Sequence, residues 1–484
     1  MAVTASCRLP IACMMSCETT SDHEDETRDD IAGLTRCPTA RPAEIQANGV
    51  GPSNLRMIKP EVQGRMKRLS LKDSPIYGEL IVVGTNGELP CPPICNKMRH
   101  RFTLVRQEKP TGVRPQDDGR DQDVTHGINI TVNKKTTIMS YGLDPDTDMF
   151  QVGRSPDDAI DLVVMDTGKD LSGQVMYKAN STVSRYACRI VCERQPPYTA
   201  RIYAGAFDAS NQIKPSTSVP SWQLSPVESD CLTTNGVGLL RPSGCFVPGV
   251  NPGRWLEVSV LGNIFTLRDK RSSRKPGSPV VEETNILTDG CLIDLCGVTL
   301  IWRTAMGLEH APTKELIRGH RDHLNATQAQ CPVNFFTLAY PPLRGSSSAA
   351  DSSSQARVKS AVSMSSAAFE RERQPWAYLR CGHVCGFHQW KASDKEDDRN
   401  RTCPTCRQTG PYAKLELGQQ RAYCLGNDPP THVFVPCGHV SSHATVRYWS
   451  SLETPYSVND WAIQCPFCKT PLAMQPPYTK LIYS

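Results

Sequence analysis

Eight of the chain's 21 cysteines lie between residue 381 and the C-terminus, where they form part of a repeated pattern. CGHV at Cys381 is followed by CPTC at Cys403, and the same order returns as CGHV at Cys437 and CPFC at Cys465. A CxxC turn directs two thiolates at one metal, and a Cys-x-His pair supplies two more ligands, which completes the tetrahedral set that Zn²⁺ prefers. The pattern therefore predicts two zinc ions, held by eight ligands: Cys381, His383, Cys403, Cys406, Cys437, His439, Cys465 and Cys468.

Sites closed by four protein ligands leave no position for a substrate water, so both are expected to be structural and not catalytic. Free thiols or a redox CxxC pair are the plainer interpretation, but matching pairs in matching order favour zinc. Two ways of sharing the metals stay open. The first ligand pair could bind one zinc with the second pair and the third with the fourth, or, in a cross-braced arrangement, the first with the third and the second with the fourth. Four neighbouring side chains could replace a ligand, although we expect bystanders: Cys385, His388, Cys424 and His443.

The remaining composition narrows the class of protein. An odd number of cysteines, and an N-terminus interrupted by Arg8 and Pro10, fit neither a disulfide framework nor a signal peptide. The longest apolar stretch, Cys291–Trp302, falls well short of the roughly 20 residues that cross a bilayer. The formal net charge is only +5, and acidic residues at Asp394–Asp398 lie between the first Cys pairs, which argues against nucleic acid. We expect a cytoplasmic, reduced protein without a membrane span.

The segment from Gln374 to Tyr483 carries more than ligands. QPWAYLRCGHVCGFHQW, PPTHVFVPCGHV and CPFCKTPL resemble the RING-like module of the Pellino ubiquitin ligases. The resemblance implies a zinc-folded platform that binds a ubiquitin-conjugating enzyme charged with ubiquitin and orients the thioester, with no covalent intermediate and no catalytic residue of its own. Arg407, directly after a zinc-binding CxxC, is the candidate transfer-orienting cation, and Lys469 is its counterpart. The plainer interpretation of each is a solvated surface cation.

Upstream of that module, the chain divides by composition. Residues 1–74 are polar, carry an acidic run at Asp22–Asp30 and predict a disordered extension, while residues 341–373 are rich in serine and predict a linker. Residues 75–340 show short strand-like segments between turn signals, and residues 374–484 form the zinc domain.

The expected strands include Tyr77–Gly84, Ala159–Met165, Arg189–Cys192, Thr199–Ala204 and a hairpin of Trp255–Val260 with Ile264–Arg268; one helix is expected, over Thr313–Thr327. The expected fold class is mainly β: a forkhead-associated-like β-sandwich followed by a small zinc-stabilised RING-like domain.

Three loop motifs follow one another on this β-rich background: FQVGR, STVSRYACRI and LTTNGV. Gly-Arg, Ser-Arg and Thr-Asn-Gly is the order in which forkhead-associated domains present their phosphothreonine-binding residues. A phosphate carries about −1.5 to −2 charge and three acceptor oxygens, which suits a guanidinium fork, a hydroxyl and a second cation. Taken singly, each motif is weak, because Asn-Gly is first a turn dipeptide and Gly-Arg occurs by chance. The candidate residues are Arg154, Ser184, Arg185, Thr234 and Asn235.

DTDMFQVGRS also resembles the forkhead-associated domain of Pellino proteins, so the resemblance covers about residues 75–340 and 374–483. One departure from other forkhead-associated domains is Ala187, three residues after the binding serine, where a histidine generally stands. The resemblance implies a ligase whose client is a phosphorylated receptor-associated kinase or adaptor of Toll-like innate immune signalling. The alternative is a non-catalytic phosphopeptide-binding scaffold with a structural zinc module.

Overall fold

A computed structural model of the chain describes residues 75–83, 95, 97–116, 124–169, 175–178, 180–343, 373–388, 400–456 and 460–483. The extension predicted to be disordered, residues 1–74, lies outside the described residues, as does the linker except for residues 341–343 and 373. No helix among the described residues is long and apolar enough to cross a membrane.

Two sheets form the β-sandwich that the sequence predicts. One sheet has seven antiparallel strands, in the order β17 (Ile264–Thr266), β16 (Trp255–Val258), β15 (Gly238–Leu240), β18 (Leu292–Asp294), β19 (Thr299–Thr304), β1 (Ile76–Val82) and β2 (Arg101–Val105). The other has the order β11 (Ala200–Ala204), β10 (Cys188–Glu193), β6 (Thr147–Gly153) and β7 (Leu162–Val163). Apolar side chains from both sheets, such as Leu80, Trp302, Phe150 and Ile190, form one buried cluster. Alternate residues of β11 are buried, as expected for a strand with one face on a core.

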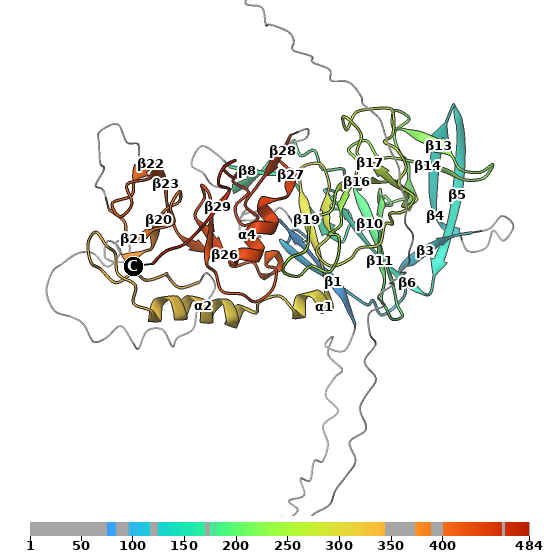
Figure 1. Ribbon diagram of the computed structural model, residues 1–484. Helices are drawn as coiled ribbons and strands as arrows, with labels where there is room; N and C mark the ends of the chain where they lie inside the picture. The colour runs from blue at the N-terminus through green and yellow to red at the C-terminus, as the bar shows by residue number, and fades with distance from the viewer. Residues whose placement is uncertain are drawn as a thin grey trace, which may run out of the picture. The chain divides into compact units, whose positions relative to one another are not determined.

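A further sheet lies beside the sandwich, and we call it the appended sheet (Figure 1). Its strands are β12 (Gln212–Ile213), β4 (Val124–Val132), β5 (Lys135–Asp144) and β3 (Gly112–Pro115), with the pair β13 (Ser221–Gln223) and β14 (Ser229–Cys231) nearby. Asn133 and Lys134 both have positive φ and form the two-residue turn that joins β4 to β5. The appended sheet has its own buried cluster, which includes Ile128, Ile130 and Phe207.

Short elements complete the N-terminal part of the described chain: the hairpin of β8 (Thr167–Lys169) and β9 (Val175–Tyr177), and the helices α1 (Ala305–Glu309) and α2 (Lys314–Ala326). The predicted helix corresponds to α2. Thr313 is its N-cap and accepts a hydrogen bond from the backbone N–H of Leu316, while Thr327 is its C-cap.

The zinc module consists of small sheets and one helix. Its sheets have the orders β21 (Val384–Cys385), β20 (Trp376–Tyr378), β23 (Thr409–Lys414), β22 (Asn400–Thr402), and β24 (Glu416–Leu417), β26 (His439–Ser441), β25 (His432–Phe434), β29 (Tyr478–Lys480). A hairpin of β27 (Glu453–Pro455) and β28 (Trp461–Ile463), the 3-10 turn η3 (Arg421–Tyr423) and α4 (His443–Ser450) complete it. Cys331, Leu338 and Tyr340 pack with the first sheet of this module.

The sandwich and the zinc module share one hydrophobic cluster, which we call the shared core. It combines side chains of the sandwich with side chains of the module: Ile81, Val83, Leu240, Phe246, Leu292 and Ile301, with Ala422, Tyr423, Leu425, Phe434, Val446, Tyr448, Trp449, Leu452, Cys465 and Phe467. Arg303, 1% exposed, crosses the boundary and donates from Nη1 to the Ala422 carbonyl at 2.7 Å. The Trp255 indole N–H likewise donates to the Glu453 carbonyl at 2.8 Å.

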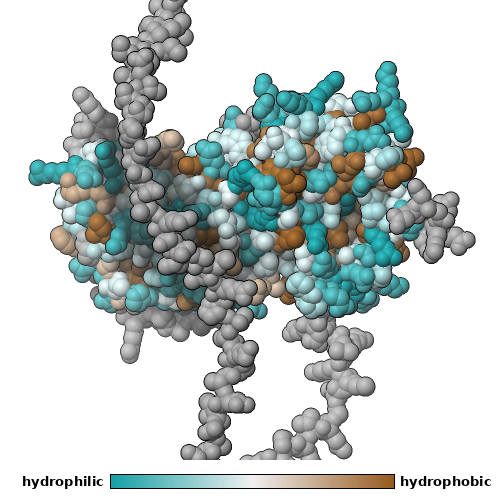
Figure 2. Space-filling model, turned by 45° about the vertical axis from the view of Figure 1, so that its right-hand side comes forward, coloured by the Kyte–Doolittle hydropathy of each residue, from teal (hydrophilic) through white to brown (hydrophobic). Residues whose placement is uncertain are grey.

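Hydrophobic residues on the face shown in Figure 2 occur in small groups separated by hydrophilic ones. The large apolar clusters described above are internal.

Candidate zinc sites and phosphate-binding loops

The first zinc site brings together Cys381, His383, Cys403 and Cys406, whose ligand atoms all lie within 4.8 Å of one another. The Cys-x-His pair follows β20, and the CxxC turn joins β22 to β23, which pairs with β20. The second site brings together Cys437, His439, Cys465 and Cys468 within the same limit. The structure thus joins the first pair with the second and the third with the fourth, and the cross-braced alternative is absent from the described residues.

The donor sets fit zinc. Each has three thiols and one imidazole, and His439 Nδ1 is buried with no hydrogen-bond partner in the described chain. Its other ring nitrogen, Nε2, lies 3.9 Å from a carboxylate oxygen of Glu416, the type of outer neighbour that orients a ligating histidine. A metal would supply the partner that this buried nitrogen lacks.

Proton affinities differ among the thiols of each group. Burial raises the pKa of Cys381 to about 12, and the neighbouring thiols add to the effect. The pKa of Cys406 is lowered: slight burial acts upward, but the Gln408 N–H and the Cys381 thiol outweigh it. In the second site, burial raises the pKa of Cys465, while hydrogen bonds from Cys437 and Cys465 lower that of Cys468. Within each site one thiol therefore loses its proton most readily, and a bound cation would displace the protons of the others.

The possible alternate ligands lie outside both groups and have other contacts. Cys385 contacts the Tyr412 hydroxyl at 3.7 Å, and His388 Nε2 lies 2.7 Å from the Tyr378 hydroxyl. Cys424 contacts the Gln420 carbonyl at 3.7 Å, and the His443 ring stacks on His432 at 4.5 Å between centroids. All cysteines of the described segments are free of disulfides.

Arg407 and Lys469 occupy equivalent positions in the two zinc turns. Each has positive φ, 62° for Arg407 and 57° for Lys469. Each also donates its backbone N–H to the carbonyl oxygen of the first cysteine of its CxxC, at 2.8 Å. Their side chains differ, because Arg407 is exposed whereas Lys469 lines a cavity with Val83 and Thr299 of the sandwich. Burial lowers the pKa of Lys469, and the carboxylates of Asp294 and Asp166 act in the opposite direction. Arg407 is thus the more accessible of the two cations.

The first two predicted phosphate-binding loops are tied together by their backbones. The N–H of Arg154 donates to the Ser184 carbonyl at 3.1 Å, and that of Ser155 to the Arg185 carbonyl at 3.2 Å. The approach is so close that a Cβ at Gly153 would lie 2.1 Å from the Arg185 oxygen. The glycine of the Gly-Arg motif is therefore required by packing. The side chains of Arg154 and Arg185 are exposed.

The third loop reaches the second through Asn235. Its amide Nδ2 donates to the Thr182 carbonyl at 2.7 Å and to Ser184 Oγ at 3.2 Å. Thr234, beside it, is exposed. The structure thus places the five predicted residues on three adjoining loops, with two exposed cations at the rim.

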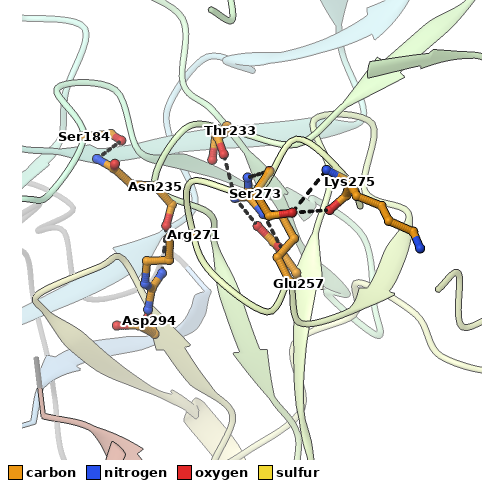
Figure 3. A network of polar contacts seen from close by, with 9 residues as sticks. Ser184, Thr233, Asn235, Glu257, Arg271, Ser273, Lys275 and Asp294 are labelled. Atoms are coloured by element: carbon orange, nitrogen blue, oxygen red, sulfur yellow. Dashed lines mark hydrogen bonds and ion pairs between the residues drawn. The ribbon is translucent and has the colours of Figure 1, made fainter. Parts of the chain in front are cut away.

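Sequence reasoning missed the ion pairs beneath the third loop (Figure 3). Arg268 pairs with Glu257 at 2.7 Å and donates to the Thr233 carbonyl at 2.9 Å. Arg271 pairs with Asp294 and donates to the Asn235 carbonyl at 2.7 Å. The basic run RDKRSSRK at residues 268–275 was a visible signal, but its acidic partners come from strands β16 and β18.

Comparison with known proteins finds the same two domains in the same order. The family model of the Pellino FHA (forkhead-associated) domain matches residues 69–319, and that of the Pellino RING domain matches residues 324–484. The chain is 41% identical to human E3 ubiquitin-protein ligase pellino homolog 2 over 85% of its length and 96% of that protein. It is 42% identical to mouse E3 ubiquitin-protein ligase pellino homolog 3, covering 82% and 87% of the two chains. It is 40% identical to Drosophila melanogaster protein pellino over 84% of its own length and 92% of that protein.

Both family domains therefore occur in the predicted order, and the relatives are similar over nearly their whole length. The chain belongs to the Pellino family, with an FHA domain followed by a RING domain that carries two sites suited to zinc.

Proposed function

We propose that the chain is a RING-type ubiquitin ligase that captures phosphothreonine-bearing clients with its FHA domain and promotes ubiquitin transfer to them with its zinc module. The observation that carries the proposal is the presence, in one folded unit, of three converging phosphate-suited loops and two closed four-ligand sites. The names of the similar proteins, E3 ubiquitin-protein ligases, support the activity.

Each loop residue has a role that its surroundings support. Arg154 and Arg185 have no ion-pair partner in the described segments. The Arg185 guanidinium lies 5.7 Å from the centre of the Tyr186 ring, a contact that leaves its N–H groups able to bind phosphate oxygens, as are those of Arg154. The Ser184 hydroxyl and the hydroxyl of the exposed Thr234 are on shorter side chains and can form hydrogen bonds to the phosphate. Asn235 is held by the two bonds of its amide nitrogen, which leaves Oδ1 to accept a backbone N–H of the client.

The zinc module contributes orientation. Zinc, when bound, holds the two CxxC turns in shape, since a closed site gives structural support and no open coordination position. A ubiquitin-conjugating enzyme charged with ubiquitin binds this platform, a client lysine attacks the thioester, and the conjugating enzyme's thiol leaves as an amide bond forms. Fixing the thioester in a reactive pose lowers the entropic cost of that step. Arg407, exposed after Cys406, is the cation available to contact the bound ubiquitin conjugate.

The resemblance to Pellino proteins extends the proposal to the client, a receptor-associated kinase or adaptor of Toll-like signalling phosphorylated in the cytoplasm. Phosphate on the client would then switch capture on. We also retain the predicted domain borders, with the FHA domain at residues 75–340, the linker at 341–373 and the RING-like domain at 374–484.

The first test separates capture from transfer. Arg154→Ala should weaken binding of a phosphothreonine peptide at least tenfold, as expected for loss of a charge-assisted hydrogen bond of about 1.5–3 kcal/mol. Autoubiquitination by the same variant, measured with activating enzyme, conjugating enzymes, ubiquitin and ATP, should be unchanged. An equal fall in both activities would contradict the division of labour.

The same reaction separates the ligase from the alternative, a phosphopeptide-binding scaffold with a structural zinc module. Chain formation by the wild-type protein that is abolished by Cys403→Ala with Cys406→Ala supports the ligase. No chain formation by the wild-type protein with a broad panel of conjugating enzymes would favour the scaffold.

A further inference from the structure

The FHA domain lacks the histidine that usually braces its phosphate-binding loops, because residue 187 is alanine and is buried. Something else must hold the loop that carries Asn235, since a binding loop whose position is not fixed loses affinity to the entropy of ordering it. Two ion pairs lie beside this loop (Figure 3).

Two arginines from the segment after β17 reach the backbone of this loop. Arg271 donates from Nη1 to the carbonyl of Asn235 at 2.7 Å, and Arg268 donates from Nη2 to the carbonyl of Thr233 at 2.9 Å. The two carbonyls flank Thr234, so the arginines hold the Thr-Asn turn on both sides. Neither arginine bond uses a side chain of the loop, which leaves the side chains of Thr234 and Asn235 directed elsewhere.

Each arginine is itself fixed by a buried carboxylate. The side chains of Arg268 and Glu257 are 2% and 4% exposed, and their contacts are 2.7 Å and 3.1 Å. Arg271 pairs with Asp294, whose side chain is 1% exposed. Glu257 and Asp294 belong to strands β16 and β18, so the arginines connect the loop to the central sheet.

We propose that Arg271 with Asp294, supported by Arg268 with Glu257, are positioning residues that hold the Thr234–Asn235 turn in its phosphothreonine-binding geometry. This inference rests on the proposed function of the three loops. The arginines do not contact phosphate: their guanidinium groups are occupied by backbone carbonyls and carboxylates, in contrast to Arg154 and Arg185. They hold the loop in the absence of that histidine.

The buried charges make this brace sensitive to removal of one partner. Truncating Arg271 alone leaves Asp294 buried and without its guanidinium, which is more costly than removing both members of the pair. A double substitution, Arg271→Met with Asp294→Leu, removes the two charges together and keeps comparable volume. A loss of peptide binding by this double variant therefore reports the loss of the brace and not unfolding caused by an unpaired buried charge.

The test uses the purified full chain and a labelled phosphothreonine peptide, chosen as the tightest binder from a degenerate library screened on the wild-type protein. We expect Arg271→Met, and the double variant, to weaken binding roughly tenfold, the scale of one hydrogen bond to a charged group. Arg271→Lys should bind with intermediate affinity, because one ammonium cannot serve both the carbonyl and the carboxylate in a planar fork.

Arg241→Met is the matched control. Arg241 is partly buried, pairs with Glu283 and donates to Thr284, but it touches none of the three loops. It should leave peptide affinity at the wild-type value.

The salt dependence of binding distinguishes the brace from a direct phosphate contact. Arg154→Ala should reduce the dependence of affinity on ionic strength, because it removes an exposed charge–charge contact. Arg271→Met should lower the affinity at every salt concentration while leaving that dependence unchanged. A purely structural role would shift the melting temperature of Arg271→Met and spare the affinity of the folded fraction.

Wild-type affinity in both Arg271→Met and the double variant, or a loss no larger than that of Arg241→Met, would overturn the brace. If the wild-type chain binds no phosphothreonine peptide, or Arg154→Ala binds as well as wild type, the proposed function fails and the brace falls with it.

Discussion

Two of the three proposed phosphate-binding loops meet most closely where the Arg185 carbonyl oxygen lies over Gly153. A Cβ at residue 153 would lie 2.1 Å from that oxygen and 2.8 Å from its carbon, and both are backbone atoms that cannot rotate away. The Gly-Arg motif therefore combines two roles. Its arginine is exposed at the rim of the site, and its glycine lets the neighbouring loop approach.

Gly153→Ala should destabilise the chain by about 1–3 kcal/mol, the usual cost of forcing atoms into a filled position. It should also weaken phosphothreonine peptide binding, because Ser184 and Arg185 are displaced with the loop. Chemical denaturation and peptide titration measure the two effects. Gly244→Ala is the matched control, since a Cβ there meets nothing within 4 Å, and it should change stability by no more than about 0.5 kcal/mol. Equal behaviour of the two variants would contradict this account.

Secondary-structure elements with strong local signals were predictable from the sequence. The expected helix over Thr313–Thr327 is α2, and both threonines are caps. The Thr313 hydroxyl accepts an N–H of the first turn, and the Thr327 hydroxyl donates to the Leu324 carbonyl at the last turn. The hairpin around Gly262 is β16 and β17, with φ of 88° at that glycine. In both cases a few adjacent residues determine the geometry.

Elements defined by distant partners were not predictable in the same way. The appended sheet was not separated from the sandwich, because alternation along β4 and β5 shows that a face is buried but not against which sheet. The eight zinc ligands were named from their spacing, yet the pairing of the Cys and His pairs needed three dimensions. The role of Arg271 could not be predicted, because its carboxylate partner, Asp294, lies 23 residues away in the sequence, on strand β18.

The appended sheet also carries a pH-sensitive group. The His126 ring on β4 packs edge-on against Phe207 at 4.7 Å between centroids, and burial lowers its pKa below the ordinary 6.5. The unfolded segment therefore binds more protons than the folded one as the pH falls through 6.5, so this contribution to stability is complete above that pH and is lost below it.

Hydrogen exchange should reveal this effect in the amides of β4 and β5. Between about pH 7.5 and about pH 5, after correction for intrinsic exchange, wild-type protection should fall more than that of His126→Gln, which cannot titrate. The same fall in both proteins would show that the histidine is not the cause.

At the scale of the whole molecule, the shared core connects metal binding to the stability of the sandwich. Cys465, a predicted zinc ligand, and Phe467, in the same CxxC turn, are completely buried in the cluster that also contains Leu292 and Ile301. A fully buried side chain of this size contributes about 1.5–3 kcal/mol of hydrophobic free energy. Unfolding the second zinc site therefore exposes one side of the FHA domain to water.

The full chain should contain two zinc ions, as measured by elemental mass spectrometry. Their removal by a chelator should lower the melting temperature of the FHA strands as well as that of the module. Hydrogen exchange of the β10 amides, whose side chains belong to the FHA cluster, can follow the former in the unaltered chain as the temperature rises. Unchanged protection of β10 after complete zinc loss would contradict the thermodynamic connection, and fewer than two ions per chain would weaken the basis for the ligase.

The shared core also fixes the distance between the two sites of the proposed ligase. With Arg303, Tyr423 and Trp255 connecting the two domains, the capture loops and the zinc turns keep a set separation. A client anchored by its phosphothreonine presents its lysines at high effective concentration only where its own chain spans that gap. Modification sites would then be chosen by their distance from the phosphate along the client, and hardly by the residues that surround the lysine.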